Sequence, residues 1–226
     1  MSHIPPEAAA SAEEISETVE QILSAGTLPP IVQAGHPALR QPAAPFDGQL
    51  SGDQLDRLIA LMRQVMHEAP GVGLAAPQLG IPLQVAVVED QFDVDPEAAA
   101  LRKRSPLEFL ALLNPRYSAL GPELASFYEG CLSLSGLQAV VARPERVLLE
   151  FQAPDGSAVR REFSGWQARI VQHETDHLNG ILYIDRAQLR SLSSNAEYAA
   201  HWAEAGIGKA SAGLGFDAGP VTPAGH

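Results

Sequence analysis

The chain has 226 residues, of which 46% are hydrophobic and 19% are charged, and its formal net charge is −12. This composition is typical of a globular protein, and the length predicts one compact domain with some additional chain. The acidic balance offers no cationic surface for a phosphate backbone, so we expect no direct binding to nucleic acid. The single cysteine, Cys131, excludes an internal disulfide and favours a reducing compartment. No secretory leader or membrane span is apparent, and we therefore expect a cytoplasmic protein with no membrane contact.

The N-terminal third predicts two amphipathic helices joined by a proline-rich connector. Ser11 and Glu14 have the spacing of a capping box, and the apolar residues that follow repeat on one helical face until Gly26. A second helix begins near Ser51 and Gln54, and its apolar stripe should pack on the core. The stripe consists of Leu55, Leu58, Ile59, Met62, Val65 and Met66.

The middle of the chain predicts strands. The expected strands are residues 83–88, 109–113, 137–142, 147–151 and 158–163, and the turn Pro154-Asp155-Gly156 joins the last two as a hairpin. The predicted fold class is therefore α+β with mostly antiparallel sheets.

The remaining segments complete this prediction. Residues 90–108 lack a clear period and should form an exposed insertion, while a helix is expected from Trp166 to Leu178, ended by Asn179-Gly180. A short helix is possible over 196–204, and the Gly/Ala/Pro-rich residues 206–226 should be disordered.

The segment His173-Glu174-Thr175-Asp176-His177 lies within the predicted helix at 166–178. Residues four apart share a helical face, so His173 and His177 can bind one metal ion while Glu174 contacts a water on it. The alternative is a pair of exposed histidines near the end of a surface helix. The spacing therefore indicates a hydrolytic metal site that needs a third ligand.

Three positions can be considered for that third ligand. A metzincin places a histidine six residues after the second one, but Tyr183 occupies that position. Glu197 lies at the distance expected for a thermolysin-like site. Cys131, in Glu129-Gly130-Cys131-Leu132-Ser133, follows a glycine that suits a tight turn beside a metal, although a lone cysteine is more often an inert core residue.

A third segment, residues 71–78, reads GVGLAAPQ. Its small residues allow close backbone approach to a ligand, although a plain turn would have the same composition. Together with EGCLS at 129–133 and QHETDH at 172–177, in this order, it resembles the peptide deformylase family. The resemblance runs from about Pro30 to Arg186.

The resemblance implies a fold in which antiparallel sheets pack around a central metal-binding helix. It also implies removal of the formyl group from the N-terminal formyl-methionine of newly synthesised proteins, with release of formate. One divalent metal ion, Fe(II) in the cell with Zn, Ni or Co as substitutes, would be bound by Cys131, His173 and His177. A metal-bound hydroxide would attack the formyl carbon, with Glu174 as general acid/base. Gln78 and the backbone N–H of Leu132 would stabilise the oxyanion.

The methionine side chain is expected against Trp166 and Ile170, which share a helical face with the histidines, and against Val72. These residues could equally be plain core. The peptide would run along Gly71–Gly73 as an added strand, with Gly73 among the substrate-binding residues. Formyl-methionine ends of nascent chains imply transient proximity to the ribosome, although residues 187–226 are not basic and predict no docking helix.

Three further observations concern the surroundings of the motifs. Glu129 and Arg143 match a family ion pair that would hold the turn at Cys131, and Asp176 would act similarly on the helix. Ser135 and Gln138 depart from a proline and an arginine that are common in the family.

We expect the chain to divide into three parts. These are an N-terminal extension (1–27), a catalytic domain (28–190) and a C-terminal helix and tail (191–226).

Two other functions are compatible with parts of the pattern. A zinc endopeptidase would use Glu197 in place of Cys131. A non-catalytic relative would bind formyl-methionine without turnover, but it would not need to retain Glu174 and Gln78.

Overall fold

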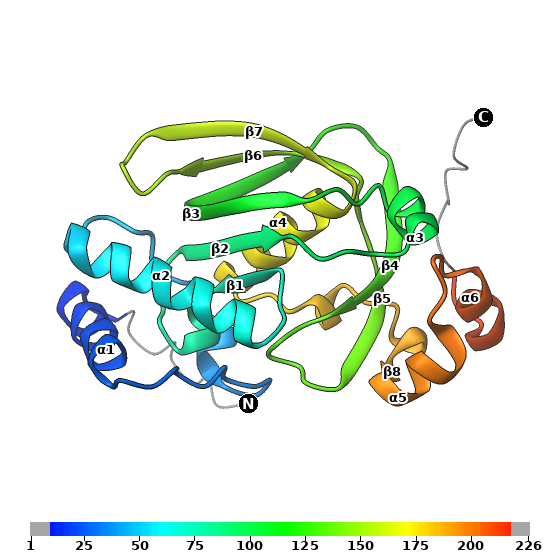
Figure 1. Ribbon diagram of the computed structural model, residues 1–226, viewed down its shortest axis with the longest axis horizontal. Helices are drawn as coiled ribbons and strands as arrows, with labels where there is room; N and C mark the ends of the chain where they lie inside the picture. The colour runs from blue at the N-terminus through cyan, green and yellow to red at the C-terminus, as the bar shows by residue number, and fades with distance from the viewer. Residues whose placement is uncertain (1–9, 218–226) are drawn as a thin grey trace, which may run out of the picture.

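A computed structural model describes residues 10–217 (Figure 1). Its helices are α1 (Ala12–Ser24), α2 (Gly52–Glu68), α3 (Pro96–Leu101), α4 (Gly165–Leu178), α5 (Asn195–Glu197) and α6 (Gly208–Leu214), with a π-helical turn at Tyr198–Trp202. Its strands are β1 (Gly73–Ala75), β2 (Val85–Asp90), β3 (Leu107–Ala119), β4 (Leu124–Gly130), β5 (Leu137–Pro144), β6 (Arg146–Gln152), β7 (Ala158–Ser164) and β8 (Ser193–Ser194). Short 3-10 turns lie at Pro37–Leu39, Ala76–Leu79, Tyr183–Asp185 and Leu189–Ser191.

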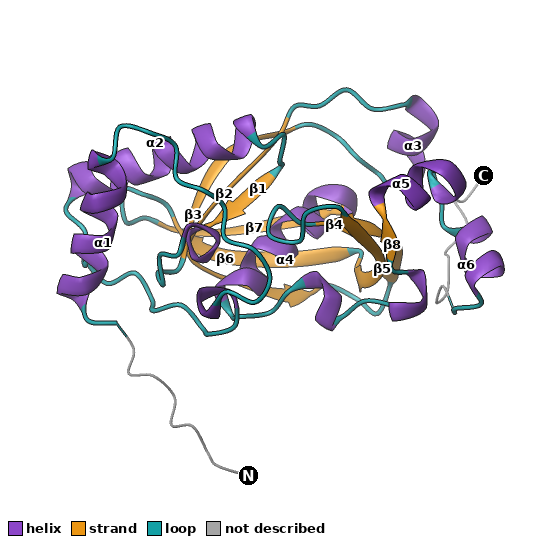
Figure 2. Cartoon of the chain, turned by 90° about the horizontal axis from the view of Figure 1, so that it is seen from below, coloured by secondary structure: helices purple, strands orange, loops and turns teal. Residues whose placement is uncertain are grey.

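The strands form two sheets, and every strand pair within them is antiparallel. One sheet has the order β1-β2-β3-β6-β7 and the other the order β4-β5-β8. Helix α4 lies in the middle of the molecule, where its apolar residues pack on the larger sheet and its polar residues bond to β4 and β5 (Figures 1 and 2). The predicted α+β class is confirmed.

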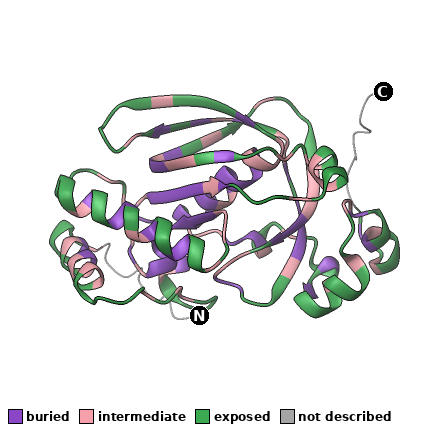
Figure 3. Cartoon of the chain, viewed as in Figure 1, coloured by how far each residue is buried: buried purple, intermediate pink, exposed green. Residues whose placement is uncertain are grey.

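Both N-terminal helices begin as predicted. The Ser11 hydroxyl accepts a hydrogen bond from the Glu14 backbone N–H at 3.2 Å, and the Glu14 carboxylate accepts one from the Ser11 N–H at 2.7 Å. Ser51 and Gln54 repeat this arrangement at the start of α2. Ile15 and Val19 are buried in the same core as the apolar stripe of α2, so α1 is part of that core (Figure 3).

The predicted strands all form, but three others were missed: β1, β4 and the two-residue β8. Strand β1 has three residues, too few to show alternation. Strand β4 has the sequence LASFYEG, in which the successive residues Ala125, Ser126 and Phe127 are half-buried. Helix α4 and the C-terminal segment (residues 195–217) cover different parts of this strand. A strand covered in this way does not show the two-residue period of a strand with one solvent face.

The two segments expected to be irregular contain helices. Asp95 caps α3 inside the 90–108 insertion by accepting bonds from the N–H groups of Glu97 and Ala98. The expectation of disorder was wrong for 206–217, where α6 forms and buries Ile207 and Phe216 against β4 and β5. Residues 218–226, also expected to be disordered, lie outside the described range.

The helix expected over 196–204 is short. Helix α5 ends at Glu197 and is followed by the π-helical turn up to Trp202. No helix within residues 10–217 is long and apolar enough to cross a membrane.

Candidate metal centre and active site

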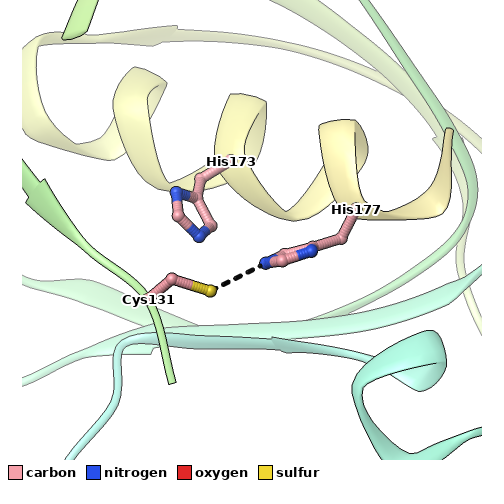
Figure 4. Close-up of side chains that lie close together, drawn as sticks. All are labelled: Cys131, His173 and His177. Atoms are coloured by element: carbon pink, nitrogen blue, oxygen red, sulfur yellow. Dashed lines mark hydrogen bonds between the residues drawn. The ribbon is translucent and has the colours of Figure 1, made fainter. Parts of the chain in front are cut away.

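Cys131 lies close to His173 and His177, and its side chain points toward the two histidines on α4 (Figure 4). Cys131 directly follows the last residue of β4, and the two histidines lie one turn apart on α4. One ligand atom from each residue lies within 4.8 Å of the others, and Cys131 Sγ is 3.2 Å from His177 Nε2. A thiolate with two imidazoles is a common ligand set for zinc and similar divalent metals.

The chemistry around these atoms fits a metal ion. Burial, together with the charge of His173, lowers the pKa of His177 well below its ordinary value, which favours the neutral ring that binds metals. Burial alone would lower the pKa of His173, but its hydrogen bonds to Cys131 and Glu129 raise it well above the ordinary value. A metal ion bound at His173 would therefore displace a proton.

Glu174 lies beside the three candidate ligands and is 4% exposed. Its Oε2 is buried and has no hydrogen-bond partner in the described part of the chain, which leaves an acceptor for a water or substrate. Burial raises the pKa of Glu174 to about 7, so this carboxyl group can gain or lose a proton near neutral pH.

Gly73 provides the space that Glu174 occupies. A Cβ at Gly73 would overlap the Glu174 carboxylate, with its Cγ and Cδ 2.6 Å away. At Gly71, a Cβ would lie 2.8 Å from the Leu132 side chain. Glycine is therefore required at 73 by close approach, as the small residues of this segment suggested.

Gln78 reaches the site from the turn after β1. Its Oε1 accepts a hydrogen bond from the Ala75 N–H at 2.8 Å, which fixes the orientation of the amide. Its Nε2 then faces Ser133 Oγ at 3.2 Å and Cys131 Sγ at 3.8 Å. The amide N–H group is thus directed toward the candidate metal centre.

A buried ion-pair network supports the histidines. Glu129 accepts hydrogen bonds from Arg143 Nε at 2.6 Å and Nη2 at 3.0 Å, and it also pairs with Arg169. Its Oε2 lies 3.1 Å from His173 Nδ1. Burial alone would raise the pKa of Glu129, but the two guanidinium groups hold it well below its usual range. Glu129 is therefore ionised and orients His173.

Arg143 extends this network to Asp176, whose Oδ2 accepts from Arg143 Nη1 at 2.8 Å. Asp176 also pairs with Arg186 and accepts a hydrogen bond from Tyr117. The contact between Glu129 and Arg143 was expected, but Arg169 was missed. Its position four residues before His173, on the same helical face, was the available signal.

The loop that follows Cys131 is held by residues near the N-terminus. Gln33 donates to the Leu132 carbonyl at 3.0 Å, and its Oε1 accepts from the Ser135 N–H at 3.2 Å. The Ala34 N–H bonds the Ser133 carbonyl at 2.8 Å. A proline at 135 has no backbone N–H and could not donate the hydrogen bond to Gln33 Oε1. Ser135, which stands where many family members have proline, makes this contact.

A cavity of about 410 Å³ opens over these residues. The sequence-predicted site residues that line it are Val72, Gly73, Gln78, Cys131, Leu132, Trp166, Ile170, His173 and Glu174. His177 is not among the residues that line the cavity: it is 1% exposed, and its Nε2 contacts Cys131 Sγ. Glu197 is not brought to the site, because its side chain is 67% exposed and pairs with His201. Gln138, on the cavity wall, donates to Asn195 Oδ1 at 3.0 Å.

Comparison with known proteins agrees with this geometry. The family model "Polypeptide deformylase" matches residues 28–192. Peptide deformylase 3 of Streptomyces avermitilis is 52% identical over 211 residues, covering 93% of this chain and 94% of that protein. The chain belongs to the peptide deformylase family. Peptide deformylase 1 of Streptomyces coelicolor is 50% identical, covering 90% of this chain and 93% of that deformylase.

Solved deformylase structures share the fold. A class I type b peptide deformylase from Acinetobacter baumannii, bound to Met-Ala-Ser, has a TM-score of 0.63 and 33% identity, covering 71% of this chain and 98% of that one. The deformylase of Thermotoga maritima has a TM-score of 0.59 and 34% identity, covering 72% and 99% of the two chains.

As a peptide deformylase, the protein is a hydrolase of a linear amide. It removes the formyl group from N-terminal formyl-methionine and releases formate. The family is metal-dependent, and the Cys/His/His group of this deformylase can bind a metal.

Proposed function

We propose that Cys131, His173 and His177 hold one divalent metal ion and that Glu174 is the general acid/base of deformylation. The observation that carries this proposal is the convergence of the three ligand atoms within 4.8 Å, beside the unpartnered Oε2 of Glu174. We propose Fe(II) as the metal in the cell, with Zn, Ni or Co as substitutes, because thiolate and imidazole ligands suit all of them.

The metal, when bound, would act as a Lewis acid and lower the pKa of a water molecule enough for it to lose a proton near neutral pH. Glu174 takes that proton through its free Oε2 and later gives it to the nitrogen of the departing amine. The Gln78 Nε2 and the Leu132 backbone N–H donate to the formyl oxygen as negative charge develops on it. Gln33 supports the second donor by fixing the Leu132 carbonyl.

The substrate proposal follows the shape of the cavity. Val72, Gly73, Trp166 and Ile170 form an apolar wall on which the methionine side chain can rest. Strand β1 is an edge of its sheet, so a peptide can add to it by backbone hydrogen bonds that do not depend on sequence. The binding of Met-Ala-Ser by the Acinetobacter enzyme supports a short peptide as the ligand.

The chemistry of the substrate also suggests where the protein works. Formyl-methionine ends arise as proteins are translated, so we propose action in the cytoplasm with transient proximity to the ribosome. We propose 28–190 as the catalytic unit, with 1–27 and 191–226 as additions to it.

Metal content tests the ligand assignment. Protein purified without oxygen should bind about one equivalent of metal, and Cys131→Ala should bind far less. Glu197→Ala, which removes the rejected third ligand, is the matched control and should keep the full equivalent. A Cys131→Ala variant that retains one equivalent and full turnover would contradict the proposal. Wild-type protein with one equivalent of metal and no turnover would instead indicate a formyl-methionine-binding protein.

A further inference from the structure

Arg102 brings a positive charge to the active-site cavity from the insertion at 90–108. Its guanidinium group stacks over the Trp166 ring, 5.3 Å from the centroid, and lies 5.8 Å from the Phe127 centroid. Its Nε and Nη2 donate to the carbonyls of Ala205 and Glu204 at 3.2 and 3.3 Å. These contacts fix the position of the guanidinium group of this cavity-lining residue.

Arg102 differs in its partners from the other two arginines that line this cavity, Arg104 and Arg169. Arg104 forms two hydrogen bonds of 2.8 Å with the buried carboxylate of Asp90, and Arg169 pairs with Glu129. Arg102 bonds only to neutral carbonyls, and within residues 10–217 no carboxylate forms an ion pair with it. A guanidinium group has five N–H donors, so Arg102 can still bind a carboxylate.

The distance from Arg102 to the candidate metal ligands defines which part of a substrate it can reach. Trp166, under Arg102, precedes His173 by two helical turns, or about 10 Å along the helix. An extended peptide advances about 3.3 Å per residue, and its first and third side chains point to the same face. If the methionine side chain lies on Ile170 and Trp166, the third side chain is therefore the one directed to the same wall.

We propose that Arg102 makes this site prefer formyl-methionyl peptides whose third residue is acidic. The proposal rests on the proposed function, since it uses the placement of the methionine side chain given there. The carboxylate of aspartate or glutamate would take the remaining N–H donors of Arg102 at the mouth of the cavity.

The test compares four peptides with amidated C-termini, so that only the side chain differs in charge. These are formyl-Met-Ala-Glu, formyl-Met-Ala-Gln, formyl-Met-Glu-Ala and formyl-Met-Gln-Ala. For the metal-loaded enzyme, we expect kcat/KM to be about five-fold higher with Glu than with Gln at the third position. At the second position the ratio should be near one.

Variants assign the preference to Arg102. Arg102→Gln should bring the third-position ratio close to one, while Arg102→Lys should keep part of it. Arg102→Gln also removes the hydrogen bonds to the carbonyls of Glu204 and Ala205, which could lower kcat/KM for every peptide. The ratio of two peptides corrects for such a general loss of activity. Arg160→Gln removes the same charge from an exposed ion pair outside the cavity and should leave the ratio unchanged.

The outcomes separate this inference from the proposed function. No turnover of the two Gln peptides by metal-loaded enzyme would count against the proposed function itself. Turnover of both with no Glu preference at the third position, or a preference that persists in Arg102→Gln, would overturn the inference alone. If Arg102→Gln does not fold, wild-type enzyme decides, because the preference should fall as salt rises from about 0.05 M to about 0.5 M.

Discussion

Gly73 and Glu174 lie so close together that the identity of one residue sets the position of the other. The Glu174 carboxylate occupies the volume where a side chain at 73 would begin. Proton transfer needs donor and acceptor within hydrogen-bond distance, so a small displacement of Glu174 affects the chemistry more than the fold.

Gly73→Ala should therefore lower kcat by about 100-fold while the enzyme keeps its metal. The measurement is deformylation of formyl-Met-Ala-Ser, with metal content determined on the same sample. Gly52→Ala is the control, because a Cβ at Gly52 meets no heavy atom within 4 Å. Activity of Gly73→Ala within a factor of three of wild type would show that Glu174 need not occupy its observed position.

Gln33 is a second residue whose effect is local. It contacts the loop on both sides of Ser133, at the Leu132 carbonyl and the Ser135 N–H. Gln33→Ala should lower kcat by about ten-fold with little change in thermal stability, because the loosened Leu132 N–H would be a weaker donor to the oxyanion. Gln41→Ala, an exposed residue of the same N-terminal connector, serves as the control. Wild-type kcat in Gln33→Ala would argue against a role of this contact.

At the scale of elements, α4 is joined to β4 and β5 by buried charges. Arg169 pairs with Glu129 and also donates to the carbonyls of Ala125 and Val141. This arrangement fixes the helix that carries both histidines against β4, the strand that directly precedes Cys131. The candidate ligands from the two elements are thus positioned together.

Arg169→Met should destabilise the metal-loaded protein by about 3 kcal/mol, because Glu129 would lose one of its two buried cations. It should also weaken metal binding, since Glu129 orients His173. Urea unfolding and metal titration measure the two effects. The exposed pair Arg160–Glu150 gives the comparison, and Arg160→Gln should cost less than about 1 kcal/mol. Equal losses in the two variants would contradict the network's role.

Helices and candidate ligands that depend on local sequence signals could be predicted from the sequence alone. The helices at 12–24, 52–68 and 165–178 were predictable because their apolar periods, and the capping boxes at Ser11 and Ser51 for the first two, are local in the sequence. Two of the three candidate ligands could be proposed from sequence because the spacing of His173 and His177 is a property of one helix. Cys131 needed the flanking sequence, since Glu197 remained open on spacing alone.

The parts that were missed depend on contacts between distant segments. Arg169 is buried only because β4 and β5 pack against α4. Arg102 reaches the cavity because the C-terminal segment accepts its hydrogen bonds. Helix α6 has the sequence GKASAGL, in which Gly208 and Gly213 weaken the helical propensity, and its burial against β4 and β5 favours it.

At the scale of the whole molecule, helix α1 belongs to the hydrophobic core. Ile15 and Val19 are 1% and 0% exposed and lie in the cluster that includes α2 and β2. Ile15→Ala should lower the free energy of unfolding by about 3 kcal/mol, as expected for a large-to-small core substitution. Glu17→Ala on the exposed face of α1 should change it by less than about 0.5 kcal/mol. Equal stability of the two variants would mean that α1 is a detachable appendage.

We propose above that Glu174 moves the proton in a metal centre that Cys131, His173 and His177 would form. The most direct measurement is free-amine release from formyl-Met-Ala-Ser by wild type and Glu174→Gln, each loaded with one equivalent of metal without oxygen. We expect turnover by wild type and a loss of at least about 1,000-fold in Glu174→Gln at equal metal content. Turnover by Glu174→Gln within ten-fold of wild type would contradict it.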